Sequence, residues 1–296
     1  MAVNKKNLYI GSTKISAVTD VSTQISDDFD LAKYMSECLY SWVGKKVAFL
    51  GDSITFGTNT DKTFHSYLQD ILGIVPTNYG IAGAMWKHTD LNKDIKTQAQ
   101  SALSSGIDFD AIIIMCGTND FYNNVTIGEW YNEEEYQTQI GDRGTIKKRV
   151  LTDASADTER GYINDALKFI KQNFTTAQVI LMTPIHRGAA GYKVMGTTYP
   201  LDDEFASNKN LNYLDDFVNT IREASSIWSC PLIDLYSDSG ILAWMEEYGS
   251  EYMNVKDDEA YSDSLHPSRY GHCRMARVIA SKLISITCGK FIVNNK

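Results

Sequence analysis

A serine, an aspartate and a histidine lie in sequence contexts that suit nucleophilic catalysis. Ser53 completes a Gly-Asp-Ser tripeptide directly after an apolar, strand-like run. A serine hydroxyl is a weak nucleophile, so it needs a base within hydrogen-bond reach. Asp263 and His266 stand three residues apart, just before Pro267, and a turn at this point would bring the carboxylate to the imidazole. The three residues predict a nucleophile, a general base and a carboxylate that orients the base.

Two other polar turns could supply hydrogen-bond donors to a developing oxyanion. Asn119 follows the apolar run Ile112–Cys116, and Gly83 ends the glycine-bearing loop that begins at Asn78. Acyl transfer requires donors that are aimed at the oxyanion in advance. The Asn119 amide and the Gly83 and Ser53 N–H groups are the candidates. Each turn alone could be ordinary turn chemistry, but their conjunction predicts a serine esterase.

The other histidines lack a neighbouring acid combined with a turn. We therefore expect them at the surface or at helix ends. These residues are His65, His88, His186 and His272.

Apolar runs of strand length alternate with helical patterns from Lys45 onward. The predicted strands are Val47–Leu50, Ile74–Asn78, Ala111–Cys116, Gln178–Met182 and Leu232–Asp234. The predicted helices are Thr63–Leu72, Asp94–Ser105, Ala154–Gln172, Ser207–Ser226 and Ser268–Ile286. Repeated strand–helix units predict a five-stranded parallel sheet within a three-layer α/β/α, flavodoxin-like fold. Ligand sites in such sheets lie at the carboxyl edge of the strands.

Three segments depart from this repeat. Residues 1–44 are predicted to form a small N-terminal extension, with strands at Leu8–Gly11 and Lys14–Val18 and a helix at Asp27–Tyr40; residues 45–296 form the main domain. Phe121–Thr152 and Arg187–Glu204 are predicted to be long irregular loops at the carboxyl edge of the sheet. The extension could tether the protein to a larger assembly or form a homo-oligomer.

Taken together, the four blocks resemble those of the SGNH, or GDSL-like, hydrolase superfamily. The matching residues are Gly51-Asp-Ser-Ile, Gly83, Gly117-Thr-Asn-Asp, and Asp263-x-x-His266-Pro. The resemblance implies that Ser53 is the nucleophile, His266 the base and Asp263 its orienting acid, with Gly83 and Asn119 completing the oxyanion hole. It covers about residues 45–286. Position 55 is Thr, so the Gly-x-Ser-x-Gly elbow of ordinary α/β hydrolases is absent.

Composition excludes several other classes of function. The net charge of −9 argues against nucleic acid and anionic membranes as partners. The five cysteines are widely spaced and form no Cys-x-x-Cys pair, which predicts free thiols rather than a disulfide framework or a zinc site. No signal peptide or membrane-spanning run is recognisable, which predicts a soluble protein, cytoplasmic if it is not exported. No metal cluster or nucleotide-binding glycine loop is present, so no cofactor is expected.

The natural ester is open on the sequence alone. The two loop insertions and the Gly83 loop are rich in aromatic residues: Trp86, Phe121, Tyr122, Trp130, Tyr131, Tyr136, Tyr192 and Tyr199. Aromatic faces with polar tips suit sugar rings, which favours O-deacetylation of a carbohydrate. The alternatives are a lipolytic or small-ester acylhydrolase resembling lysophospholipases or thioesterases and, in another class, an inactive carbohydrate-binding or structural module. The same aromatic side chains could instead pack against the core.

Overall fold

The computed structural model describes residues 8–10, 13–15, 41–137, 145–188, 190–194, 197–201, 204–255 and 261–286. The chain divides into two compact units, Met1–Ser41 and Trp42–Lys296. In the first unit, strand β1 (Leu8–Ile10) pairs antiparallel with β2 (Thr13–Ile15). The predicted helix at Asp27–Tyr40 lies outside the described residues.

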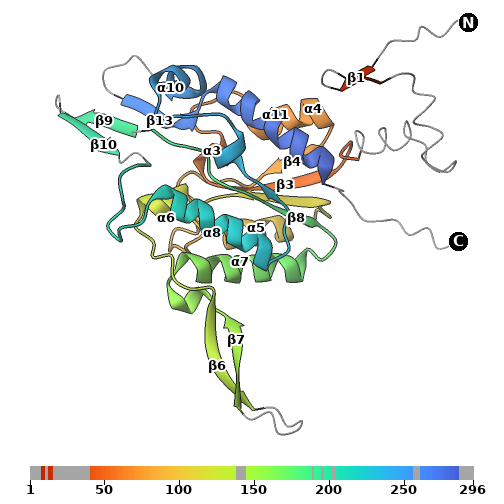
Figure 1. Cartoon of the computed structure of the whole chain (residues 1–296), viewed down its shortest axis with the longest axis vertical. Helices are drawn as coiled ribbons and strands as arrows, with labels where there is room; N and C mark the ends of the chain where they lie inside the picture. The colour runs from red at the N-terminus through yellow and green to blue at the C-terminus, as the bar shows by residue number, and fades with distance from the viewer. Residues whose placement is uncertain are drawn as a thin grey trace, which may run out of the picture. The chain divides into compact units, whose positions relative to one another are not determined.

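The second unit is built on a five-stranded parallel sheet (Figure 1). Its order is β11-β8-β5-β3-β4, which is the flavodoxin-like order. The strands are β3 (Lys46–Gly51), β4 (Val75–Asn78), β5 (Ala111–Met115), β8 (Gln178–Met182) and β11 (Leu232–Ile233). The three-layer fold and the five predicted strands are therefore confirmed.

Helices cover both faces of this sheet, which explains why the central strands lack polar alternation. Helices α4 (Phe64–Leu72) and α11 (Arg269–Ser285) pack on one face. Helices α5 (Ile95–Ser104), α7 (Glu159–Asn173) and α8 (Leu214–Ile227) pack on the other. Along β3, Val47 and Phe49 join the first layer of the core while Ala48 and Leu50 join the second.

Trp42 belongs to the core of the second unit, although the sequence placed it in the extension. Its side chain is fully buried, and its indole Nε1 donates a hydrogen bond to the Leu283 carbonyl at 2.7 Å. Trp42 therefore holds the C-terminal turn of α11 from a position just ahead of β3.

Polar caps define where the predicted helices begin. The side chains of Thr63, Asp94 and Ser268 accept hydrogen bonds from the first turns of α4, α5 and α11. Two predicted helices begin later than the sequence indicated. A 3-10 turn (Ala154–Ala156) and Asp157, at φ +52°, precede α7, and α8 starts only at Leu214.

The two segments predicted as irregular loops contain β-hairpins instead. Strand β6 (Tyr131–Gln137) pairs antiparallel with β7 (Thr145–Leu151), and three consecutive glutamates from Glu133 face basic residues from Arg149 back to Lys147. This hairpin projects away from the sheet (Figure 1). Cross-strand charge pairs stabilise such a ribbon without apolar alternation, so the hydrophobic pattern did not reveal it.

The second hairpin joins a separate four-stranded sheet with the order β10-β9-β13-β12. Its strands are β9 (Ala190–Val194), β10 (Thr197–Leu201), β12 (Met253–Val255) and β13 (Tyr261–Pro267). The remaining short helices are α3 (Ser53–Phe56), α6 (Thr118–Tyr122), α9 (Leu235–Asp238) and α10 (Glu246–Tyr252).

Candidate active site

A continuous chain of hydrogen bonds links Ser53, His266 and Asp263. Ser53 is the first residue of α3, two positions after β3 ends, and its Oγ lies 2.8 Å from Nε2 of His266. The other ring nitrogen of His266, Nδ1, lies 2.9 Å and 3.0 Å from the two carboxylate oxygens of Asp263. Asp263 is fully buried, and the other two side chains are each about 9% exposed. The arrangement can take a proton from the serine and stabilise the resulting imidazolium.

Asp263 is held in place by donors on three sides of its carboxylate. The Asn59 side-chain amide donates to Oδ2 at 2.8 Å, and the backbone N–H groups of His266 and Leu265 donate to Oδ1 at 2.9 Å and 3.2 Å. Burial by itself would raise the pKa of Asp263. The hydrogen bonds and the His266 ring outweigh burial, so its pKa lies below the usual value and the group is charged at neutral pH.

The segment that carries this pair is the end of β13. Asp263 pairs in register with Ala190 of β9 and with Asn254 of β12, where the register shifts. The Asn254 amide donates to the carbonyls of His266 and Pro267 at 3.2 Å and 2.9 Å. The backbone around the histidine is therefore fixed by a sheet that the hydrophobic pattern did not predict.

Close packing explains the glycine two residues before the serine. A Cβ on Gly51 would lie 2.3 Å from Thr55 Oγ1 and 2.5 Å from the Met115 carbonyl oxygen, which leaves no room for a side chain. The Gln98 amide of α5 bonds both backbone groups of Gly51, at 2.7 Å and 2.9 Å. Asp52 accepts a hydrogen bond from Ile54 N at 2.9 Å, and burial raises the pKa of Asp52 to about 6.

The Gly83 loop and the Asn119 turn lie next to one another. The Asn119 amide donates to the Ala84 carbonyl at 2.9 Å. Gly83 is exposed at φ +79°, a conformation that favours glycine. Among the described residues, neither the Gly83 nor the Ser53 N–H donates to a protein acceptor. Two backbone donors and the second N–H of the Asn119 amide are thus available to a ligand.

Asp120 holds the backbone of the residues that follow Gly83, a role that sequence reasoning did not assign. Its buried carboxylate accepts hydrogen bonds from Trp86 N at 3.0 Å and from Lys87 N at 3.1 Å. Burial raises the pKa of Asp120 to about 6, and the nearby carboxyl of Asp52 contributes in the same direction. The position directly after Asn119 was the available sequence clue.

The environments of the other histidines correct the sequence prediction. His65 on α4 and His272 on α11 are buried, and burial lowers their pKa values to about 4 and about 3. His88 and His186 each contact a carboxylate, Asp94 at 2.9 Å and Glu204 at 2.8 Å. His272 Nδ1 accepts a hydrogen bond from Phe64 N in the first turn of α4 at 3.1 Å. Tertiary packing creates these partners, which the local sequence does not show.

Three of the eight aromatic residues picked out from the sequence are buried. Trp86, Phe121 and Trp130 are 2%, 1% and 7% exposed and belong to the core. Their packing is the alternative that the sequence left open. Tyr122 and Tyr136 are exposed, and the side chains of Tyr192 and Tyr199 lie outside the described residues.

An exposed aromatic pair that the sequence did not reveal lies near the Asp263 segment. Phe205 and Trp244 meet edge to face, with ring centroids 5.3 Å apart, and are 62% and 42% exposed. The neighbouring Gly188 donates its N–H to the Ser264 carbonyl at 3.0 Å. A Cβ on Gly188 would lie 2.6 Å from the Ala243 carbonyl oxygen, so Ala243 packs closely against Gly188. Trp244 is the residue directly after Ala243.

Within the described part of the chain, no helix is long and apolar enough to cross a membrane. The same residues contain no group of three His, Cys, Asp or Glu side chains that could hold a metal ion. Cys116, Cys230 and Cys273 are free thiols.

Comparisons with known proteins agree with this architecture. The family model of the GDSL-like Lipase/Acylhydrolase family matches residues 49–274, and the chain belongs to this family. It is therefore a serine ester hydrolase of the esterase and acylhydrolase class. A comparison with curated proteins found no significant match.

Several solved structures resemble this one. A protein from Lactobacillus plantarum is 21% identical, with a TM-score of 0.61 over 82% of this chain and 98% of its own. A possible lipase from Chitinophaga pinensis is 17% identical, with a TM-score of 0.53 over 80% and 96%. An acetylxylan esterase from Geobacillus stearothermophilus is 17% identical, with a TM-score of 0.49 over 82% and 96%. At these identities, the first two show a shared fold.

Proposed function

We propose that this hydrolase cleaves its ester through an acyl-enzyme on Ser53, with His266 as general base and Asp263 as the group that orients it. The carrying observation is the hydrogen-bond chain from Ser53 Oγ to His266 Nε2 at 2.8 Å and from His266 Nδ1 to the Asp263 carboxylate at 2.9 Å. Because Asp263 is charged and only accepts, it requires the His266 proton on Nδ1 and leaves Nε2 to face the serine.

The reaction proceeds in two acyl transfers. Nε2 of His266 takes the proton of Ser53 as Oγ attacks the ester carbonyl carbon, and it then gives that proton to the leaving alcohol. A water molecule attacks the resulting acyl-serine while His266 removes one of its protons. The carboxylic acid leaves, and the proton returns to Ser53 Oγ.

The proposed oxyanion hole combines the N–H groups of Ser53 and Gly83 with the Asn119 amide. One N–H of that amide is held by the Ala84 carbonyl, which fixes its plane and leaves the other N–H for the substrate oxygen. Donors fixed in advance stabilise the charge that develops in the transition state without reorganising.

We further propose that the natural substrate is an O-acetylated carbohydrate. The exposed Phe205–Trp244 pair supports this substrate, since aromatic faces stack on sugar rings. Gly188 packs against Ala243, the residue before Trp244, and donates its N–H to the carbonyl of Ser264, the residue after Asp263. A long acyl chain would instead need a continuous aliphatic surface to bury.

The test is an ester panel run on the wild type and on Ser53→Ala. p-Nitrophenyl esters from acetate to long chains are compared with acetylated xylan and other acetylated sugars. We expect acetyl release from the sugars and a preference for acetate among the p-nitrophenyl esters, with both lost in Ser53→Ala. A clear preference for long acyl chains would overturn the carbohydrate assignment and favour a lipolytic acylhydrolase.

A fluorophosphonate probe separates the enzyme from an inactive binding module. Such a probe reacts with an activated serine, so we expect stoichiometric labelling of the wild type and none of Ser53→Ala. Absence of labelling in a folded wild-type protein would favour the module.

A further inference from the structure

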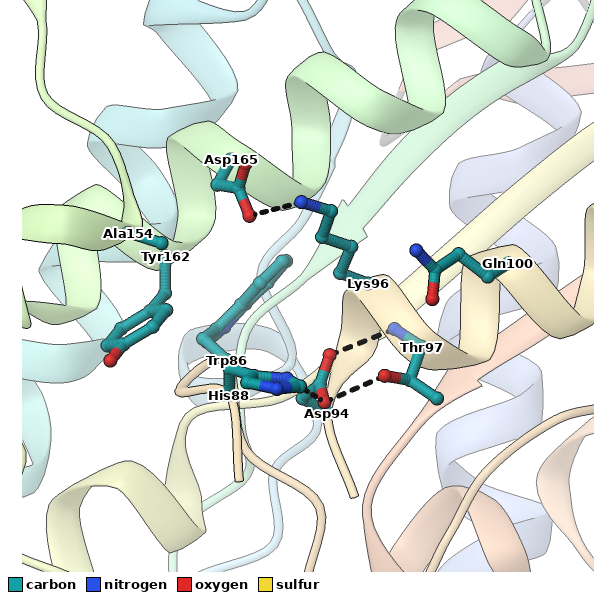
Figure 2. A pocket seen from close by; sticks show the side chains of 9 residues that line it. All are labelled: Trp86, His88, Asp94, Lys96, Thr97, Gln100, Ala154, Tyr162 and Asp165. Carbon is teal, nitrogen blue, oxygen red and sulfur yellow. Dashed lines mark hydrogen bonds and ion pairs between the residues drawn. The ribbon is translucent and has the colours of Figure 1, made fainter. Parts of the chain in front are cut away.

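A pocket of about 360 Å³ opens beside the loop that carries Gly83 (Figure 2). One side is formed by residues of α5 and the loop before it, and the other by residues of α7. The lining residues are Trp86, His88, Asp94, Lys96, Thr97, Gln100, Ala154, Tyr162 and Asp165. None of them belongs to the proposed catalytic machinery.

A buried carboxylate orients the histidine of this pocket. Asp94 is 1% exposed and accepts hydrogen bonds from Thr97 N, Thr97 Oγ1 and His88 Nδ1, each at 2.9 Å. Since the carboxylate accepts, His88 donates through Nδ1, and its other ring nitrogen, Nε2, takes no part in that bond. The His88 side chain is 59% exposed, so a ligand can reach that nitrogen.

The acidic groups of the pocket are already hydrogen-bonded to its basic side chains. Lys96 Nζ lies 2.7 Å from Asp165 Oδ2, opposite the His88–Asp94 pair in Figure 2. An anionic ligand would meet two carboxylates, and an apolar acyl chain would desolvate both pairs without replacing their hydrogen bonds. The pocket therefore disfavours both kinds of ligand.

The polar groups that remain suit hydroxyl groups. Gln100 supplies both a donor and an acceptor, and His88 Nε2 supplies a further polar atom. The indole Nε1 of Trp86 is buried and has no hydrogen-bond partner among the described residues, although buried donors are normally paired. A hydroxyl both donates and accepts, so a neutral polyhydroxylated ring matches this mixed set of groups.

Two structural connections join the pocket to the proposed catalytic residues. The backbone N–H of Trp86 donates to the carboxylate of Asp120, which directly follows Asn119 in α6. Helix α5, which carries Lys96 and Gln100, also carries Gln98, whose amide bonds Gly51 two residues before Ser53. The loop and the helix therefore support both sites.

We propose that this pocket is a sugar-binding subsite that takes a neutral, unacetylated unit of the carbohydrate substrate. The inference rests on the proposed carbohydrate esterase function. A subsite away from the ester improves binding of an oligomer but leaves a small ester unaffected, because a small ester does not reach it.

The experiment compares His88→Ala and Gln100→Ala with the wild type on two substrates. For an acetylated xylo-oligosaccharide, we expect each variant to raise KM about 5- to 10-fold, the effect of one lost hydrogen bond, with little change in kcat. For p-nitrophenyl acetate, both constants should stay at wild-type values. Ser104→Ala, on an exposed position of the same helix, is the matched control.

Two further arms keep the outcomes distinct. His88→Gln keeps a side-chain acceptor and should recover part of the lost affinity, whereas a structural role would show as a lower Tm and slower p-nitrophenyl acetate turnover. Wild-type KM for the oligosaccharide in both alanine variants would overturn the subsite and leave the esterase assignment intact. A wild-type enzyme that ignores acetylated sugars but cleaves long-chain esters would overturn the carbohydrate function, and the subsite with it.

Discussion

The amide of Asn59 donates a 2.8 Å hydrogen bond to Oδ2 of Asp263, across 204 positions of sequence. This oxygen also lies 2.9 Å from His266 Nδ1, so Asn59 touches the carboxylate that orients the histidine. Asn59 has φ +62°, a conformation open to asparagine and glycine but strained for most residues. The asparagine can therefore be replaced by glycine without a change in backbone conformation.

Asn59→Gly should lower kcat/KM about 3- to 10-fold, which corresponds to part of the free energy that a hydrogen bond to a charged group contributes. The loss of this donor should also raise the pKa of Asp263, so the fall in kcat/KM should be largest on the acid limb of the pH–rate profile. Steady-state kinetics from pH 4 to pH 8 measure both effects. Asn92→Gly is the control, because Asn92 is exposed and has φ +53°. An unchanged acid limb in Asn59→Gly would contradict this role.

Ser53→Ala should reduce esterase activity to background while the free energy of unfolding changes little. The substitution removes one oxygen atom from a residue that is 9% exposed, and it leaves the hydrogen bonds between His266 and Asp263 in place. Hydrolysis of p-nitrophenyl acetate and a urea unfolding curve give the two readouts. Retained turnover would show that another residue is the nucleophile.

Asn119→Ala should lower kcat about 10²- to 10³-fold, the usual effect of removing one oxyanion donor. The control is Asn123→Ala at the end of the same helix, since the Asn123 amide is exposed and bonds only the backbone carbonyl of Asn119, which leaves the Asn119 side chain in place. Circular dichroism should show both variants folded. Full activity in Asn119→Ala would refute its assignment as an oxyanion donor.

Asp120→Asn should weaken the dependence of stability on pH. The folded protein holds the Asp120 proton more tightly than the unfolded chain does, because its pKa is raised to about 6 from 3.8. Its contribution to the free energy of unfolding is therefore fully present below about pH 4 and is lost as the pH rises through about 6. A shift of this size corresponds to about 2–3 kcal/mol.

Urea unfolding at pH 4 and pH 7 measures this difference between the wild type and Asp120→Asn. An asparagine oxygen can still accept from Trp86 N and Lys87 N, because both N–H groups lie 3.1 Å from the same carboxylate oxygen. Asp70→Asn changes an exposed carboxylate and is the control. If the free energy of unfolding fell by the same amount from pH 4 to pH 7 in Asp120→Asn and in the wild type, the raised pKa of Asp120 would be contradicted.

Local patterns along the chain were enough to predict the parallel sheet and most helix starts. Buried central strands carry uninterrupted apolar runs such as Ala111–Met115, and capping side chains such as Asp94 mark where helices begin. The spacing of Asp263 and His266 carried the prediction that they meet, because their contact spans three residues. These features depend on near neighbours, which a sequence displays directly.

Contacts between distant segments were decided by the tertiary structure alone. The bond from Asn59 to Asp263, the anchoring of Trp86 by Asp120 and the approach of Phe205 to Trp244 join segments that no local pattern relates. The sequence predicted the residue types for catalysis at Ser53, but burial decided which aromatic residues and histidines remain accessible to a ligand. Burial depends on the packing of the whole chain, since each side chain is covered by residues far away in sequence.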